Sequence, residues 1–522
     1  MSDPVHSHAA LLEQEFGTVP DLIRFNAQAR PDQAALVKDD AVLTYGQLDA
    51  LMDQIAASFQ RDGVTKGQSI SICAGSSIAY AAVFLAGLRA GIAVAPLAPS
   101  STPESLITML ADCDAKRFFL DASVAKALAG QTLTMPVTTL DGSGFGQTLE
   151  AWLAPVCSVP APVAIAPEDP FNIIYSSGTT GAPKGIVQSH GMRWSHTGRG
   201  GGFGYGPGTV TLLSTPLYSN TTLVSFFPTI ALGGTAVLMD KFDALGFLKL
   251  AQAHKVTHAM LVPVQYRRIL ELPSFDDYDL SSFQMKFCTS APFAGTLKAD
   301  ILRRWPGGLV EYFGMTEGGG TCMLLAHEHP DKLHTVGQPA PGHDIRLIDE
   351  AGKELPHGEV GEIVGRSPAM MNGYHNQPGK TSDAEWYSPE GLRFIRTGDV
   401  GRFDAEGFMT LMDRKKDMII SGGFNIYPSD LEAVVVGHPD VAEVAVVGAP
   451  SDRWGETPVG FVTLKAGASS TADQIKDWAN ERLGKTQRLA ALNLIDVLPR
   501  SAIGKVLKRE LRDQFLAGNT VA

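Results

Sequence analysis

The segment from Ser176 to Gly185 brings together the residue types that hold phosphate groups. It has the sequence Ser-Ser-Gly-Thr-Thr-Gly-Ala-Pro-Lys-Gly, and the apolar residues 171–175 before it predict a buried strand. Glycines let backbone N–H groups approach phosphate oxygens, hydroxyls donate hydrogen bonds, and a lysine supplies positive charge. The segment therefore predicts a polyphosphate-binding loop. Its candidate binding residues are Ser176, Ser177, Gly178, Thr179, Thr180 and Lys184.

A Walker A loop and a flexible linker both fit this segment less well. A Walker A loop needs GxxxxGK followed by Ser or Thr, whereas the order here is GxxGxPKG. A flexible glycine–serine linker has no need of Pro183, Lys184 and Gly185, nor of a buried strand before them. The segment resembles instead the phosphate-binding loop of the adenylate-forming superfamily, which includes acyl- and aryl-CoA synthetases, free-standing adenylation domains and luciferases.

A second segment, Glu-Tyr-Phe-Gly-Met-Thr-Glu, resembles the aromatic-Gly-x-Thr-Glu motif of that superfamily. The resemblance implies that the aromatic ring stacks on adenine, that the threonine contacts the α-phosphate and that the glutamate binds Mg²⁺. The superfamily usually has tyrosine where this chain has Phe313, so stacking is retained and any bond of the hydroxyl is lost. One carboxylate suffices for magnesium when phosphates supply further ligands. The implied residues are Phe313, Gly314, Met315, Thr316 and Glu317, the last two as catalytic residues.

Three shorter matches complete the implied nucleotide site. The small residues Ser290, Ala291 and Pro292 match a turn on the other side of adenine. Asp399, in Arg-Thr-Gly-Asp, matches an aspartate that accepts hydrogen bonds from both ribose hydroxyls. A carboxylate suits a vicinal diol because it offers two acceptor oxygens. Arg414 follows Asp399 and is implied to contact the nucleotide as well.

Two lysines complete the catalytic set that the resemblance implies. Lys505, in Pro-Arg-Ser-Ala-Ile-Gly-Lys, matches the catalytic lysine of adenylation, which stabilises charge on the α-phosphate and on the attacking carboxylate. Lys416 falls at the hinge position, where a charged side chain can be solvated in both orientations of a moving domain. Without the resemblance, either lysine would be interpreted as a solvated surface residue.

Two segments between these lysines resemble CoA-binding parts of the superfamily. Gly422 and Gly423 match a loop that lines the pantetheine tunnel after domain rotation, and glycines suit the close passage of a thin ligand. Trp454, beside Arg453, matches a segment that stacks on the CoA adenine in some aryl-CoA ligases. A tryptophan that packs between domains fits equally well. Before Arg488 the proline of the related Lys-x-Pro-Arg run is absent, so no CoA contact is inferred there.

The resemblance places the acid pocket after the strand predicted at 211–214. Where the superfamily has Pro-Leu-aromatic-His, this chain has Tyr218, Ser219 and Asn220, so a gating histidine is missing. These residues and Thr289 are the candidate pocket residues. Neither an aspartate for an amino-acid ammonium group nor a cation for a second carboxylate is evident there. The expected substrate is a monocarboxylic acid with an aromatic or medium aliphatic group.

Composition narrows the class of protein. The chain has 522 residues, of which 44% are hydrophobic and 19% charged, as in a folded enzyme of two or more domains. Its net charge of -12 argues against nucleic-acid binding. Five cysteines without CxxC spacing indicate neither a disulfide framework nor a zinc site, so we expect a reducing cytoplasm. The N-terminus has no signal pattern, and residues 78–97 predict a buried helix and strand rather than stable membrane insertion.

The elements that must position these residues alternate along the chain. A capping box at Thr44 and apolar residues at helical spacing predict a helix that ends near Gly63. Short apolar runs such as 69–72 and 235–238 alternate with helical segments such as 245–254, which predicts an α/β fold. As in adenylate-forming enzymes, we expect a large multi-layered N-terminal domain and a small mobile α+β C-terminal domain. The predicted boundaries are 1–413 for the first domain, 414–416 for the hinge and 417–522 for the second domain.

The ordered motifs imply an ATP-dependent acid:CoA ligase. An acid carboxylate would attack the α-phosphate of ATP and form an acyl-adenylate, from which the CoA thiol would displace AMP after the small domain rotates. The implied cofactors are ATP, Mg²⁺ and CoA, and the partner is a small-molecule carboxylic acid. Related enzymes are often dimers, so the resemblance implies a homodimer.

Three alternatives remain open. A stand-alone adenylation enzyme would load the acid onto a carrier protein instead of CoA. A non-catalytic nucleotide-binding protein is disfavoured, since Lys184, Glu317, Asp399 and Lys505 are all present. A luciferase-like oxygenase is the most remote alternative, because oxygen chemistry leaves no motif in this sequence.

Overall fold

The computed structural model describes residues 11–176, 184–414, 417–421, 424–451, 453–484, 487–500 and 506–518. Within these ranges, only the backbone is described for Ser176, Asp413, Arg414, Phe424 and Asn425. The chain folds into two compact units. Unit 1 comprises Met1–His334, Pro339–Asp344 and Gly365–Ile395, and unit 2 comprises Thr335–Gln338, Ile345–Val364 and Arg396–Ala522. The hinge predicted at residues 414–416 describes how the C-terminal domain would move between two orientations, and it stays a prediction.

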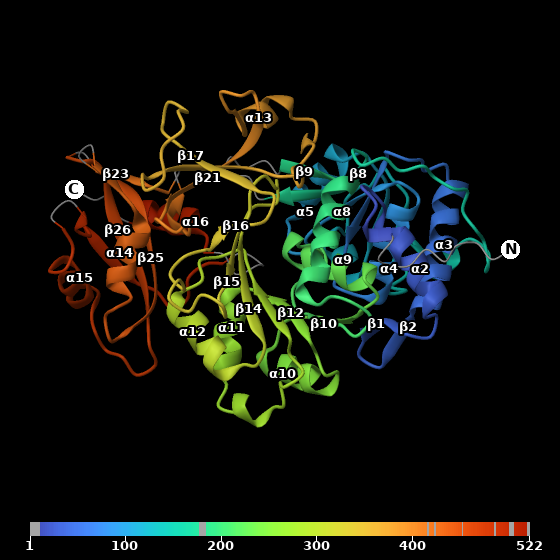
Figure 1. Cartoon of the computed structure of the whole chain (residues 1–522), viewed down its shortest axis with the longest axis horizontal. Coiled ribbons are helices and arrows are strands. Elements are labelled where there is room, and N and C mark those ends of the chain that lie inside the picture. Colours follow the sequence, from blue (N-terminus) through green and yellow to red (C-terminus); the bar gives the residue numbers. More distant parts are fainter. Residues whose placement is uncertain are drawn as a thin grey trace. The chain divides into compact units, whose positions relative to one another are not determined.

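The first sheet of unit 1 is mainly parallel, as the alternating pattern predicts (Figure 1). Its strands lie in the spatial order β15 (Cys322–Leu325), β14 (Gly308–Phe313), β13 (Met285–Cys288), β12 (His258–Leu261), β10 (Val210–Leu213), β11 (Thr235–Leu238), β1 (Ala34–Lys38) and β2 (Ala41–Thr44). From β14 to β1 all neighbours are parallel, whereas β15 and β2 pair antiparallel. The carboxyl ends of the parallel strands therefore share one edge.

The second sheet of unit 1 contains the strand predicted before the phosphate-binding segment. Its strands lie in the order β19 (Gly373–Tyr374), β9 (Lys184–Ser189), β8 (Pro170–Ser176), β4 (Ala93–Pro96), β3 (Ser69–Cys73), β5 (Ala115–Leu120), β6 (Val137–Thr139) and β7 (Gln147–Thr148). β8 is buried and pairs antiparallel with β9, which confirms the predicted buried strand. These two strands flank the predicted phosphate-binding loop on both sides.

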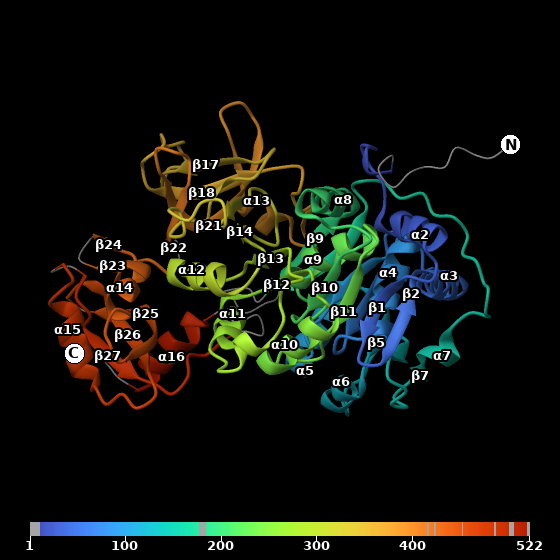
Figure 2. The ribbon, with the colours of Figure 1, turned by 60° about the horizontal axis from the view of Figure 1, so that its bottom comes forward.

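Helices pack between the two sheets of unit 1 (Figure 2). α4 (Ile78–Arg89) is buried almost all round, and α9 (Asn220–Ala231) is nearly so. A helix that is apolar on all faces is expected only where it is covered on all faces. Phe84 of α4 contacts Phe171 of the second sheet and Phe227 of α9. The apolar run at 78–97 is thus a buried helix followed by β4, as predicted, and no described helix is long and apolar enough to cross a membrane.

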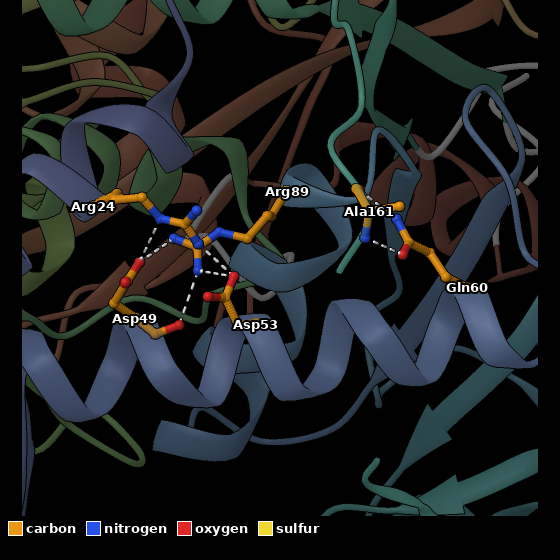
Figure 3. Close-up of polar contacts among 6 residues, drawn as sticks. All are labelled: Arg24, Asp49, Asp53, Gln60, Arg89 and Ala161. Atoms are coloured by element: carbon orange, nitrogen blue, oxygen red, sulfur yellow. Dashed lines mark hydrogen bonds and ion pairs between the residues drawn. The ribbon is translucent and has the colours of Figure 1, made fainter. Parts of the chain in front are cut away.

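An ionic cluster joins the three N-terminal helices, α2 (Val19–Ala29), α3 (Tyr45–Arg61) and α4 (Figure 3). Asp49 and Asp53 of α3 both form ion pairs with Arg24 of α2 and with Arg89 of α4. The predicted capping box of Thr44 begins α3, and the helix ends just before Gly63, so both predictions are confirmed. These contacts hold the helices that cover the sheets.

The remaining helices of unit 1 follow the strands that they connect. α8 (His190–Gly198) continues from β9 and leads into the 3-10 helix η1 (Arg199–Phe203), and both matter for the site below. The others are α5 (Pro103–Asp112), α6 (Ala122–Ala127), α7 (Leu149–Trp152), α10 (Ala244–Ala253), α11 (Pro263–Leu270), η2 (Phe275–Asp277), α12 (Gly295–Arg304) and α13 (Pro378–Asp383). Strand β20 (Glu385–Tyr387) pairs with the first residues of β21 (Arg393–Phe403).

Unit 2 contains a hairpin and a separate α/β layer. Strands β17 (Asp344–Ile348), β18 (Gly361–Arg366), β21 and β22 (Met409–Arg414) form one sheet, whereas the short strand β16 (Gln338–Pro339) pairs with β15 at the edge of the first sheet. The other sheet has the order β24 (Phe424–Ile426), β23 (Ile419–Ser421), β26 (Gly455–Leu464) and β25 (Val441–Ser451), with β27 (Ala491–Leu494) beside β26. α14 (Pro428–Val435) and α15 (Ala472–Asn480) pack on one face and α16 (Lys508–Gly518) on the other, which confirms the predicted α+β character of this region.

Candidate functional site

Three predicted segments of unit 1 begin where parallel strands of its first sheet end. Residues 214–220 follow β10, residues 289–292 follow β13, and residues 314–317 follow β14. Ligands of open parallel sheets bind at the carboxyl ends of the strands. The fold therefore brings the predicted acid pocket, adenine turn and catalytic Thr-Glu pair to one edge.

Hydrogen bonds tie the adenine turn to its neighbours. Thr289 Oγ1 donates to the carbonyl oxygen of Tyr312 at 2.9 Å, and Ser290 Oγ lies 2.6 Å from Thr221 Oγ1. Ser290 has a φ of 80°, in the left-handed region that a residue with a Cβ seldom occupies. Strained backbone of this kind concentrates at binding sites. Phe293, just beyond the turn, is buried and stacks on Tyr266, so it belongs to the core rather than to a pocket.

The aromatic motif lies at the end of β14. Phe313 is its last residue and is half-buried, whereas Gly314 is exposed. Met315 packs against an apolar cluster that includes Ile186 and Tyr374. Phe313 is not fully buried, and its predicted stacking on adenine stays a prediction.

The backbone around Glu317 is held by the segment 369–371. The Met371 N–H donates to the carbonyl oxygen of Glu317 at 2.8 Å, and the Gly319 N–H donates to Ala369. Gly318 has a φ of 74°, and a Cβ there would lie 1.9 Å from the carbonyl oxygen of Ala369. Only glycine fits at this position, so these contacts define the backbone of the loop that carries Glu317.

Tyr374 links Glu317 to Lys184, the lysine of the predicted phosphate loop. Its hydroxyl donates to Glu317 Oε1 at 2.8 Å, and Lys184 Nζ lies 5.0 Å from the centre of its ring. Burial and the Glu317 carboxylate raise the pKa of the Tyr374 hydroxyl, so it remains a donor. The structure thus brings the two predicted residues together through a third that the sequence did not single out. The candidate loop residues Ser177, Gly178, Thr179 and Thr180 lie outside the described residues, and of Ser176 only the backbone is described.

A fully buried arginine connects the predicted acid pocket to the catalytic loop. Arg193 donates to Asn220 Oδ1 at 2.7 Å, to Asn172 Oδ1 at 3.3 Å and to Gln188 Oε1. Gln188 in turn donates through Nε2 to the carbonyl oxygen of Thr316 at 2.6 Å. Burial lowers the pKa of Arg193 to about 9. The sequence identified Asn220 and Thr316 but not the two residues that join them.

The position of the missing histidine is buried. Ser219 caps α9 without a side-chain bond to the helix and is 8% exposed. Its neighbour Tyr218 is half-buried, and burial raises the pKa of its hydroxyl. Both follow β10 and precede Asn220, and their role in an acid pocket stays a prediction.

In unit 2, the predicted ribose and nucleotide residues are cross-strand neighbours. Asp399 of β21 stands directly opposite Arg414 of β22 in the antiparallel register. The Asp399 N–H donates to Thr397 Oγ1 at 3.0 Å, and Arg396 pairs with Glu362 through two bonds of 3.2 and 2.7 Å. Fifteen positions apart in sequence, the two residues therefore lie side by side on one hairpin.

Of the remaining predicted residues of unit 2, the structure describes Trp454 but not the hinge lysine, the tunnel glycines or Lys505. Trp454 is 47% exposed beside the β25–β26 turn, and the Arg453 guanidinium lies 4.7 Å from its ring centre. An exposed Arg–Trp pair can stack on a nucleotide base, and the CoA contact stays a prediction. The hinge residue Lys416, the tunnel glycines Gly422 and Gly423, and Lys505 lie outside the described residues.

The buried histidine His258 begins β12, and its ring nitrogens bond to Thr257 and to the carbonyl oxygen of Phe203. Across the described ranges of the chain, no three His, Cys, Asp or Glu side chains group as metal ligands would.

Comparisons with known proteins agree with this architecture. Residues 23–375 match the AMP-binding enzyme family, and residues 430–505 match the AMP-binding enzyme C-terminal domain. The chain is 31% identical to 4-coumarate–CoA ligase-like 9 of Oryza sativa subsp. japonica, over 96% of this chain and 93% of the relative. It is 30% identical to the fatty acid–[acyl-carrier-protein] ligase ScoC of Streptomyces coeruleorubidus, over 95% and 96%. The ATP-bound structure of MatB from Rhodopseudomonas palustris superposes with a TM-score of 0.85 at 27% identity, covering 96% of this chain and 99% of MatB.

Proposed function

The chain belongs to the AMP-binding enzyme family, and from this we propose that it is an ATP-dependent acid:CoA ligase that works through an acyl-adenylate. One observation carries the proposal: Tyr374 joins Lys184 of the phosphate-binding segment to Glu317 of the Thr-Glu pair. A reacting polyphosphate needs both a cation for its phosphates and a carboxylate for a magnesium ion.

In the first step, an oxygen of the acid carboxylate forms a bond to the α-phosphorus of ATP. The bond between that phosphorus and the bridging oxygen breaks, and pyrophosphate leaves. Lys184 and the hydroxyls of the predicted loop hold the phosphates, and Thr316 donates to the α-phosphate. Lys505 stabilises the charge that develops on the α-phosphate and on the carboxylate.

Glu317 is the residue that would hold Mg²⁺. One of its oxygens accepts the Tyr374 hydroxyl, and the carboxylate is half-buried, so a second oxygen can face a ligand. Magnesium keeps several water or phosphate ligands and needs few from the protein, which fits one carboxylate. The ion would neutralise phosphate charge as pyrophosphate departs.

In the second step, the CoA thiol sulfur forms a bond to the acyl carbonyl carbon and AMP leaves. We propose that the domain formed by residues 417–522 rotates about Lys416 relative to residues 1–413. Rotation withdraws Lys505 and presents Gly422 and Gly423 to pantetheine, while Trp454 stacks on the CoA adenine. One site then serves two transition states and shields the adenylate from water.

Pyrophosphate release with ATP and Mg²⁺ tests the proposal. The panel consists of aryl, aryl-propenoic and C2 to C16 aliphatic acids, each with and without CoA. We expect release with one class of monocarboxylic acid, aromatic or medium aliphatic, and thioester only with CoA. Absence of release and of ATP–pyrophosphate exchange with every acid would contradict the proposal.

A carrier protein is the second candidate acceptor, because one relative is named as a ligase of fatty acids to acyl carrier protein. The first step would be unchanged, and the thiol would belong to a phosphopantetheinyl group on the carrier. Offering CoA and a phosphopantetheinylated carrier in parallel separates the two. Thioester on the carrier alone would replace the CoA ligase assignment.

We also propose a homodimer in the cytoplasm that binds no nucleic acid. The net charge of -12 supports the last point, because a nucleic-acid partner would need a basic surface. The described cysteines are all free thiols, which suits a reducing compartment. Sedimentation analysis of the purified chain tests the dimer.

A further inference from the structure

Helix α8 and the residue after it carry three basic side chains at three-residue spacing: Arg193, His196 and Arg199. Residues three apart lie on the same side of a helix. Within the described part of the chain, none of the three has a carboxylate within ion-pair distance. Burying a positive charge without a counter-ion costs free energy. A basic side chain that is buried in this way therefore indicates a binding site for a ligand.

This side of α8 lies along the loop that follows Glu317. At one end, Arg193 reaches Thr316 through Gln188. Met192, also on α8, has its Cε 3.0 Å from where a Cβ on Gly318 would lie. At the other end, Arg199 Nη1 lies 2.8 Å from His343 Nε2, and the Thr321 N–H donates to His343 Nδ1 at 2.9 Å.

His343 is therefore faced by two donors. Burial, followed by the charge of Arg199, lowers the pKa of His343 to about 4, so its ring is neutral at neutral pH. A neutral imidazole accepts at only one nitrogen, and Arg199 and the Thr321 N–H cannot both be satisfied by it. Among the described residues, Arg199 donates to one other acceptor, the carbonyl oxygen of Ser195, at 3.2 Å. The cluster of Arg199, His196 and His343 thus has more N–H donors facing it than its acceptors can satisfy.

A second group of the same cluster also lacks a partner. His196 Nδ1 is buried without a hydrogen bond in the structure. Arg199 and His343 are half-buried rather than enclosed, so a ligand atom can reach them, whereas the Nδ1 atom of His196 is enclosed. Arg199 and His343 thus offer a guanidinium and an imidazole to an incoming acceptor.

We infer that Arg199, with His343, binds an acceptor oxygen at the end of the acid remote from its reacting carboxylate. This inference rests on the proposed ligase function, because the reacting carboxylate is placed near Thr316, at the other end of the same loop. A phenolic oxygen, a carbonyl oxygen or a carboxylate would satisfy the donors. A hydrocarbon end would leave the guanidinium unpaired, and a site built for a polar group discriminates strongly against an analogue without it.

Matched pairs of acids test the inference. 4-Coumarate is compared with cinnamate, and suberate with octanoate, in pyrophosphate release by the full-length protein. We expect kcat/KM to be about 10- to 100-fold higher for at least one oxygen-bearing acid than for its partner. In Arg199→Met this ratio falls to about one, whereas Arg199→Lys keeps part of it. A preference for suberate over octanoate would indicate a bound carboxylate, and a preference for 4-coumarate over cinnamate would indicate a bound phenol.

The exposed residue Arg303 provides the matched control. Its side chain is 72% exposed and pairs only with Asp300 in the described structure, so Arg303→Met should keep the wild-type ratio. Thermal melting of Arg199→Met checks that it is folded. Should it fail to fold, His343→Gln is measured in its place. A wild-type ratio near one for both pairs, or an unchanged ratio in folded Arg199→Met, would overturn the inference while leaving the ligase proposal intact.

Calorimetric titration of the same acids separates the two proposals. If no acid supports ATP–pyrophosphate exchange, the ligase proposal fails. Tighter binding of 4-coumarate than of cinnamate to the wild type, lost in Arg199→Met, would still support the oxygen-binding cluster. Equal binding to the wild type within both pairs, 4-coumarate with cinnamate and suberate with octanoate, would contradict it.

Discussion

At the scale of single residues, the site depends on side chains that connect predicted residues rather than on the predicted residues alone. Tyr374 and Gln188 have no ligand role in the proposed reaction. Each nevertheless makes a bond that orients the loop of Thr316 and Glu317. The bond of Tyr374 is to a carboxylate, and such bonds are among the stronger hydrogen bonds in proteins, so its loss should be measurable.

Tyr374→Phe tests the connection to Glu317. The ring beside Lys184 is retained and the hydroxyl bond to the carboxylate is lost, so we expect adenylation to fall about tenfold. The apparent affinity for Mg²⁺ should fall with it. ATP–pyrophosphate exchange at several Mg²⁺ concentrations measures both quantities.

Tyr387 offers a matched control for that substitution. Its hydroxyl donates to Glu385 at 3.0 Å, but the side chain is 56% exposed and belongs to no predicted site. Tyr387→Phe should leave the exchange rate and its Mg²⁺ dependence as in the wild type. Identical effects of the two substitutions would show that Tyr374 has no special role.

At the scale of elements, the loop after β14 requires glycine at one position. Gly318→Ala would place a methyl group 1.9 Å from the carbonyl oxygen of Ala369, in addition to the strain of a φ of 74°. We expect a loss of about 3 kcal/mol in the free energy of unfolding and loss of adenylation, because Glu317 must move. Urea unfolding followed by circular dichroism, together with pyrophosphate exchange, measures the two effects.

A substitution at Gly342 separates the cost of steric overlap from the cost of backbone strain. It has a φ of 78°, but nothing lies within 4 Å of the position that a Cβ would occupy. Gly342→Ala should therefore cost only the strain, about 1 kcal/mol. If both alanine variants were equally stable, the contact between Gly318 and Ala369 would not constrain the loop.

Helix α8 also predicts how stability depends on pH. His190 begins this helix, and burial lowers its pKa to about 4, below the 6.5 expected in the unfolded chain. The folded protein binds fewer protons than the unfolded chain between these values. The contribution is therefore present above pH 6.5 and is lost as the pH falls towards 4, by about 3 kcal/mol.

Urea midpoints measured from pH 7 to pH 4 check this dependence. His190→Gln removes the titrating group, so its stability should fall less steeply over the same range. His343 contributes with the same sign, because burial lowers its pKa to about 4 as well, and some slope should therefore remain. Equal slopes for the wild type and His190→Gln would assign the dependence to other groups.

At the scale of the whole molecule, the two half-reactions should separate. Lys505→Ala should abolish adenylate formation, because the charge on the α-phosphate loses its stabilising cation. Thioester formation from preformed acyl-adenylate and CoA should be spared, since Lys505 is proposed to be withdrawn in that step. Pyrophosphate exchange measures the first step, and a single-turnover thioester assay measures the second.

Lys508 provides the control for Lys505. It lies three residues further on, at the start of α16, where its Nζ pairs with Glu432 at 2.9 Å. Lys508→Ala should retain both half-reactions. Equal loss of both half-reactions in Lys505→Ala would show that the lysine acts on stability or on both steps alike.

The sequence by itself determined the local elements and the order of the motifs. The capping box at Thr44, the buried helix at 78–89 and the strand before Ser176 depend on residue type and spacing within a few turns or strand lengths. Such patterns determine the conformation of the residues that carry them, so they predict local structure without knowledge of the fold. The family resemblance added the roles of residues far apart in the chain.

Only the tertiary structure decided which side chains meet. Tyr374 and Glu317 are 57 residues apart, and Arg199 and His343 are 144 apart. Asp399 faces Arg414 because the register of a hairpin places them opposite each other. Strand order and register set these contacts, and neither can be derived from local spacing. For the same reason the sequence showed no cation near the acid pocket, whereas the folded helix α8 brings Arg193 and Arg199 alongside the loop of Thr316.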